Sequence, residues 1–127
     1  MALLELFVDG RHVTSVAADG LAIATPSGST AYSLSAGGPM VAPSVPCTIV
    51  TPVAPHSLSF RPIVVPETSV LEVHLPEGAR AAAARASFDG RHAARVRRGS
   101  SLVVRTCRFA LPQVGCGGRG AARALWL

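Results

Sequence analysis

One stretch near the start of the chain changes character twice: DGLAIATPSGSTAYSLSAGG, residues 19–38. Residues 21–25 are apolar and predict a strand. A compact loop of threonine, proline, serine and glycine follows, and Ser29 or Thr30 is expected to cap a short helix over residues 30–36. A glycine pair and a proline come next, which is typical of a helix end. The stretch therefore predicts strand, polar loop and one brief helix.

A Ser/Thr/Gly loop that opens a helix presents unpaired backbone N–H groups, and the helix dipole adds partial positive charge there. Such a site suits a phosphate or a ribose-bearing ligand. An ordinary capped helix without a ligand is the alternative that the stretch by itself leaves open.

The flanking sequence favours short strands separated by turns. Asp9-Gly10 and Asp19-Gly20 are both hairpin signals, because that turn type needs positive φ. Residues 55–66 are rich in proline and predict an irregular or edge segment, residues 80–86 fit helix or strand, and residues 87–91 predict a hairpin tip. Strands are expected at residues 4–8, 12–16, 47–52, 70–75, 94–98 and 102–106, the last two joined around Gly99-Ser100.

Composition fits one globular domain with a real core, because 49% of the 127 residues are hydrophobic and only 15% are charged. The formal charge is +5, and every basic residue is arginine. An arginine-only set fits anion recognition or a bias in the coding sequence. Aromatic residues make up only 5% of the chain, which argues against nucleic-acid binding.

The three cysteines, Cys47, Cys107 and Cys116, show no CxxC spacing, which argues against a disulfide framework and a zinc site. Reduced thiols favour a reducing compartment, cytoplasmic or organellar. We find no secretory signal and no apolar run of the ~18 residues that a bilayer span requires. The chain begins directly in a strand-like run, so we expect a domain truncated at its start. The domain would cover residues 1–114, with a disordered or atypical tail over 115–127.

Three blocks together carry a family resemblance: residues 19–38, TPVAPHSLSFRP at residues 51–62 and SFDGR at residues 87–91. In this order and spacing they resemble the C-terminal domain of the NAD kinase family, over roughly residues 4–112. The resemblance implies a mainly β, sandwich-like domain with one short helix after the TPSGSTAY loop.

The resemblance also implies an activity. NAD kinases transfer the γ-phosphoryl group of ATP, or of polyphosphate in some members, to the 2′-hydroxyl of the adenosine ribose of NAD. They use a divalent metal, usually Mg²⁺, which we do not expect this fragment to bind alone. They are homodimers or homotetramers in which an N-terminal α/β domain and neighbouring subunits complete the NAD site. The partners implied here are NAD, ATP and further copies of the chain, with no membrane.

The resemblance implies roles for individual residues of this sequence. Asp19 matches an aspartate that contacts the nucleotide in the inter-domain cleft, and Tyr32 would pack on a base or ribose. Ser27 and Ser35 would offer hydroxyl groups, and Arg91 stands where many relatives have glutamine. The full expected NAD-binding set is Asp19, Ser27, Thr30, Ala31, Tyr32, Ser33, Leu34, Ser35, Ala54, His56 and Arg91.

Two departures bear on activity. Ala18 replaces the glycine that usually precedes Asp19, and the family's GGDGT loop and Asn-Glu or Asn-Asp motif are absent from the sequence. We therefore assign no catalytic residue and no metal ligand, and we expect the fragment to be inactive alone. The alternative functions are a non-catalytic β-rich assembly module, which would associate through sheet edges, or a nucleic-acid-binding module.

Overall fold

The computed structural model describes residues 2–56 and 60–110. Nine strands and two very short helical segments are assigned there: β1 Ala2–Val8, β2 Arg11–Ala18, β3 Gly20–Ala24, the 3₁₀ segment η1 Ser27–Thr30, α1 Tyr32–Ser35, β4 Cys47–Val53, β5 Ile63–Pro66, β6 Leu71–His74, β7 Ala83–Phe88, β8 His92–Arg97 and β9 Ser101–Val104. The expected tail at 115–127 lies outside the described residues.

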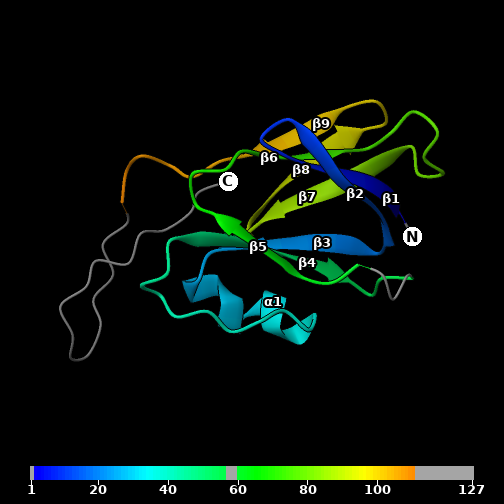
Figure 1. Ribbon diagram of the computed structural model, residues 1–127. Coiled ribbons are helices and arrows are strands. Elements are labelled where there is room, and N and C mark those ends of the chain that lie inside the picture. Colours follow the sequence, from blue (N-terminus) through cyan, green and yellow to red (C-terminus); the bar gives the residue numbers. More distant parts are fainter. Residues whose placement is uncertain (1, 57–59, 111–127) are drawn as a thin grey trace.

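The strands form two layers (Figure 1). One layer is a four-stranded antiparallel sheet in the order β2-β1-β6-β9. The other is a three-stranded antiparallel sheet, β3-β4-β5, and β7 and β8 pair as a separate hairpin. The expectation of a mainly β, sandwich-like domain with one short helix is confirmed.

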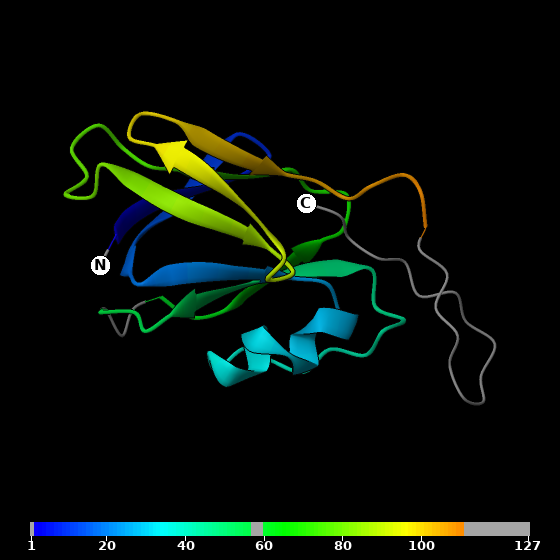
Figure 2. The same cartoon turned by 180° about the vertical axis from the view of Figure 1, so that it is seen from behind.

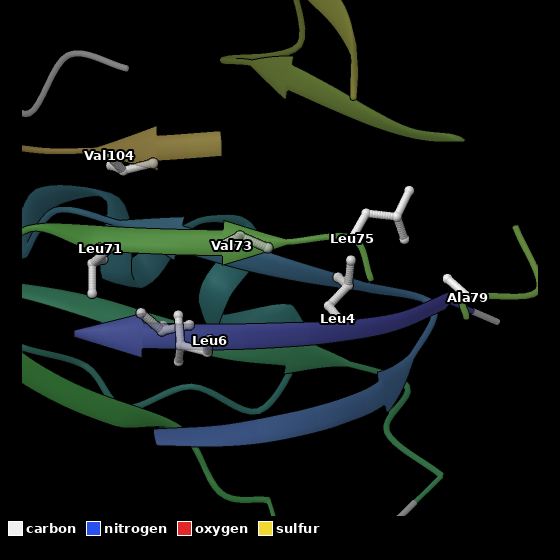
Figure 3. Packing of buried hydrophobic residues seen from close by; sticks show 8 residues of the cluster. Leu4, Leu6, Leu71, Val73, Leu75, Ala79 and Val104 are labelled. Atoms are coloured by element: carbon white, nitrogen blue, oxygen red, sulfur yellow. The ribbon is translucent and has the colours of Figure 1, made fainter. Parts of the chain in front are cut away.

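The core lies between the layers because alternate residues of each strand face inward. Leu4 and Leu6 of β1 meet Leu71 and Val73 of β6, and Val50 of β4 joins them from the other sheet. Figure 3 shows the side chains of Leu4 and Leu6 on β1 near those of Leu71 and Val73 on β6. The remaining buried members of the cluster are Leu75, Ala79 and Val104.

The Asp9-Gly10 hairpin is confirmed. Asp9 has φ 51° and Gly10 has φ 75°, as expected where both central residues of the turn need positive φ. The backbone N–H of Val70 donates to the Asp9 carboxylate at 2.8 Å, which ties this turn to the start of β6. The hairpin tip at residues 87–91 is also confirmed, with Asp89 at φ 49° between β7 and β8.

The hairpin expected at Asp19-Gly20 is wrong. The strands on either side of it belong to different sheets, so the chain crosses from one layer to the other here. Gly20 is not among the described positive-φ residues, and it pairs with Val53 as the first residue of β3. Asp19-Gly20 therefore lies at a crossover between the two sheets, because β3 pairs with β4 and not with β2.

The structure also decides the segments at residues 80–86 and 55–66 and the strands on either side of Gly99. The ambiguous residues 80–86 lead into strand β7, and the proline-rich segment 55–66 ends in the edge strand β5. The strands joined around Gly99, which has φ 76°, do not pair with each other. Instead, β8 pairs with β7 and β9 pairs with β6, because Leu102 and Val104 complete the four-stranded layer.

Candidate functional site

The polar loop and short helix cover the outer face of the three-stranded sheet. η1 and α1 lie on the side of β3-β4-β5 away from the four-stranded layer, and α1 contacts β3 and β4 (Figures 1 and 2). Between β3 and η1 the chain turns back, so η1 and α1 run toward the end at which β3 begins. This cover explains why residues 47–52 of β4 are buried on both faces.

The expected N-cap is wrong. Ala31 precedes α1 without a side-chain cap, and the predicted single helix over 30–36 is divided into η1 and α1. The capping hydroxyl belongs to Thr25, whose Oγ1 accepts the backbone N–H of Gly28 at 3.0 Å and lies 2.9 Å from Ser27 Oγ. Ser27 is thus held in the base of the loop.

Ser29 is fully buried and links the loop to the segment after α1. Its hydroxyl donates to the carbonyl of Pro26 at 2.6 Å, and its Oγ accepts the backbone N–H of Val41 at 3.0 Å. A hydroxyl that serves in this way satisfies buried backbone groups. Ser29 therefore fixes the loop from beneath and does not face solvent.

Ser33 is the second anchor. Its side chain is 1% exposed, and its Oγ lies 2.8 Å from Thr51 Oγ1 of β4. The backbone N–H of Gly38 donates to the carbonyl of Ser33 at 2.8 Å. A Cβ at position 38 would stand 2.3 Å from Ser33 Oγ and 2.6 Å from Thr51 Oγ1, so only glycine fits against this pair. Gly37, with φ 86°, ends the helix as expected.

The other residues of the segment face outward. Thr30, Ala31 and Ser35 are exposed, Leu34 is 42% exposed and the Tyr32 side chain is 71% exposed. The segment thus has a buried side held by serines and an outer side that carries hydroxyl groups and one aromatic ring. Of the segment's predicted residues, only Ser33 has its side chain in the interior.

A second group of predicted residues meets where the chain crosses between layers. The backbone N–H of Asp19 donates to the carbonyl of Val53 at 3.0 Å, and that of His56 donates to the carbonyl of Ala17 at 2.9 Å. Ala54 lies between them with φ 48°, a left-handed conformation that is strained for alanine. Asp19, Ala54 and His56 are exposed and lie together at this end of the sheets.

Arg91 stands apart from both groups. It follows the tip of the β7–β8 hairpin, where its backbone N–H donates to the carbonyl of Phe88 at 3.0 Å. The β7–β8 hairpin is a separate two-stranded sheet, which includes neither α1 nor the crossover. The structure thus brings most predicted site residues onto one sheet, β3-β4-β5, and leaves Arg91 on another hairpin.

A metal cluster is absent from the described part of the chain: no three His, Cys, Asp or Glu residues there are placed to hold an ion. Likewise, no helix within residues 2–56 and 60–110 is long and apolar enough to cross a membrane.

Sequence reasoning missed three supporting residues, Thr25, Gly38 and Thr51. Thr25 has a signal in its place directly before Pro26, because a threonine oxygen readily caps the turn that follows. For Gly38 the sequence signal is the glycine pair Gly37-Gly38, although the sequence does not show which side chains pack against Gly38. Thr51 has none, since its partner is contributed by a segment eighteen residues earlier.

The fold and its exposed segment define a two-layer β domain that presents hydroxyl groups and an aromatic ring on one outer face. The model for the ATP-NAD kinase C-terminal domain matches residues 1–115. The chain belongs to this family.

Relatives and solved structures agree with this assignment. The chain is 45% identical over 114 residues to NAD kinase 2, chloroplastic, of Arabidopsis thaliana, a match that covers 90% of the chain and 12% of that protein. It is 46% identical over 114 residues to the NAD(+) kinase of Saccharomyces cerevisiae, covering 90% of the chain and 21% of that protein. The chain thus spans about an eighth to a fifth of these relatives.

Two solved structures share the fold. The yeast NADH kinase complexed with NADH aligns with a TM-score of 0.69 at 40% identity, over 80% of this chain and 28% of that one. The NAD kinase from Archaeoglobus fulgidus in complex with ATP aligns with a TM-score of 0.66 at 32% identity, over 81% of this chain and 42% of that one.

Proposed function

We propose that the chain provides the NAD-binding part of an NAD kinase, which phosphorylates the 2′-hydroxyl of the adenosine ribose of NAD at the expense of ATP and yields NADP. The family match supports this proposal, as do relatives named NAD kinases. Two structural neighbours, complexed with NADH and with ATP, support a nicotinamide dinucleotide and ATP as the ligands.

One observation carries the proposal. The segment from Thr30 to Ser35 turns its hydroxyl groups and the Tyr32 ring outward, while Ser29 and Ser33 hold it rigidly from beneath. A pre-formed surface of this kind binds a ligand without first having to become ordered. The Tyr32 ring would pack on the adenine or ribose, and Thr30 and Ser35 would bond to ribose hydroxyls.

The crossover group would complete the surface. Asp19, which is exposed, would accept a hydrogen bond from the nucleotide, and Ala54 and His56 lie beside it at the same end of the sheets. Ser27 supports the loop through Thr25. Arg91 would contribute from the separate β7–β8 hairpin.

Phosphoryl transfer depends mainly on positioning and charge stabilisation. A rigid β domain that holds the acceptor ribose suits this division of labour. The group that activates the hydroxyl, the ATP site and its magnesium ion would then belong to a separate N-terminal domain, and a homodimer or homotetramer would complete the NAD site. A reducing compartment, cytosolic or organellar, fits the free thiols of Cys47 and Cys107.

The direct test is a chimera that joins this chain to the N-terminal domain of the Saccharomyces cerevisiae NAD(+) kinase. NADP formation from NAD and ATP should be restored in the chimera and absent from either part alone. The matched control carries Ser33→Ala with Gly38→Val, which should loosen the segment and abolish turnover. A folded, correctly assembled chimera that binds no NAD would contradict the proposal.

A further inference from the structure

The β7–β8 hairpin has two chemically different faces. Ala84 and Val96 are cross-strand partners that pack against the core. Because side chains alternate along a strand, the odd-numbered residues of both strands face away from the core. This outer face of the hairpin carries Ala83, Arg85, Ser87, Ala93, Arg95 and Arg97.

Like charges face each other on this outer face. Arg85 and Arg95 are direct cross-strand partners, and Arg97 lies two residues further along the same side of β8. All three are exposed, and no carboxylate within residues 2–56 and 60–110 forms an ion pair with them. Like charges placed directly opposite destabilise a strand pair. Folding alone gives no reason for this arrangement.

A shallow, open depression of about 590 Å³ adjoins the arginines. It is lined by Arg85, Arg95 and five alanines, Ala82, Ala83, Ala84, Ala93 and Ala94. On the outer face, Ala83 and Ala93 lie on either side of the Arg85–Arg95 pair along the strands. Small side chains beside long cationic ones leave room for an anionic segment to lie flat against the backbone.

The charge and shape of this outer face distinguish between three possible binding partners. A second copy of the same face would set arginine against arginine. Single-stranded nucleic acid binds through stacking on aromatic rings, and this face has none. An extended peptide places alternate side chains about 6.7 Å apart, which matches Arg95 and Arg97, two positions apart on β8.

The geometry points to a docking surface on the β7–β8 hairpin for an extended acidic polypeptide segment, with carboxylates at alternating positions. Arg85, Arg95 and Arg97 bind these carboxylates, and the small side chains of Ala83 and Ala93 beside them leave room for the peptide backbone. This surface lies on the outer face of β7 and β8, whereas the proposed nucleotide surface lies over β3 and β4 and takes only Arg91, at the hairpin tip, from β7–β8.

Fluorescence anisotropy with the full chain tests the inference. The probe is a labelled peptide of alternating Glu and Ala, compared with alternating Gln and Ala and with a peptide of the same composition in which the glutamates form one block. The alternating acidic peptide should bind best, and binding should weaken as ionic strength rises from about 0.02 M to about 0.5 M. Equal binding of the block peptide would overturn the inference.

Variants locate the surface. The Arg85→Ala/Arg95→Ala double variant should weaken peptide binding about tenfold. The matched control is Arg11→Ala/Arg105→Ala, which removes the same charge from elsewhere and should bind as the parent does. An equal loss in both variants would show non-specific attraction and overturn the inference. Arg97→Ala, which has alanine opposite it, serves as a second variant if the first does not fold.

Arg85→Glu separates binding from stability. The new carboxylate opposes Arg95 directly, so the melting temperature should rise while peptide binding is lost. If an oligothymidylate bound more tightly than the peptide, the face would be a nucleic-acid site and the inference would be overturned. The inference would also be overturned if sedimentation showed a dimer of the parent chain that the double variant no longer forms, because the face would then serve self-association.

Discussion

The hydroxyl oxygens of Ser33 in α1 and Thr51 in β4 lie 2.8 Å apart, in a buried contact that joins the helix to the sheet. Gly38 closes over this pair, and its missing side chain is what allows the approach. The contact holds a helix of only four residues, which would be unstable in isolation. The exposed side of the segment, with Tyr32, therefore owes its position to two hydroxyl groups and one glycine.

Gly38→Ala should destabilise the domain, because the new Cβ would overlap both hydroxyl oxygens. We expect a loss of about 1–3 kcal/mol in the free energy of unfolding, measured by urea denaturation. Gly78→Ala is the matched control, since a Cβ there meets nothing within 4 Å, and it should change stability little. Equal effects of the two substitutions would refute the close approach at Gly38.

A double-mutant cycle should show that Ser33 and Thr51 act as a pair. Ser33→Ala or Thr51→Val alone leaves a buried hydroxyl without its partner and should lower the free energy of unfolding by about 1–3 kcal/mol. The double variant should lose less than the sum of the two, because neither hydroxyl is then left unpaired. Strict additivity would mean that the two groups do not interact.

Tyr32→Ala should weaken NAD binding without changing stability. The ring is 71% exposed, so its removal should alter the free energy of unfolding by less than about 0.5 kcal/mol. In the chimera, the NAD dissociation constant should rise about five- to tenfold if the ring packs on the nucleotide. Phe109→Ala, which removes a ring that is 69% exposed elsewhere, should leave the constant unchanged. An unaltered constant in the Tyr32 variant would remove that residue from the site.

Thiol reactivity should distinguish Cys47 from Cys107. Burial, and secondarily the negative charge of Glu67, raise the pKa of the Cys47 thiol. Cys47 should therefore react with iodoacetamide much more slowly than the half-buried Cys107 at neutral pH, as peptide mass spectrometry would show. Faster labelling of Cys47 in the folded chain would contradict its burial.

The same raised pKa links Cys47 to alkaline stability. Below the pKa of the unfolded thiol, about 8.5, the folded and unfolded states both hold the proton. As pH rises from there through the higher pKa of the folded state, the unfolded chain loses the proton first, so stability should fall. Cys47→Ala should flatten this part of the stability profile, measured by urea denaturation at several pH values.

Local patterns predicted most strands and failed where partners are distant. Asp9-Gly10 and Asp19-Gly20 are the same dipeptide, yet only the first forms a hairpin. The difference lies in β4, which comes some thirty residues after the second dipeptide and captures β3. Similarly, β9 follows β8 in sequence but pairs with β6, because its apolar residues complete the four-stranded layer.

The candidate site was likewise predicted only in part from the sequence. Its outer residues were predicted from the motif, and the exposure of Thr30, Tyr32 and Ser35 agrees with that placement, while their contact with NAD stays a prediction. The supporting hydroxyl groups were not predicted as such. Ser29 was expected to cap a helix and instead bonds to Pro26 and Val41.

The sequence by itself determined that this is a mainly β domain with one short helix, and its three ordered blocks determined the family. These follow from periodicity and from residue types that fit few conformations. Only the tertiary structure decided which layer each strand joins, which serines face inward and which arginines oppose each other. Those features depend on contacts between residues far apart in the chain, whose free energy exceeds any local preference.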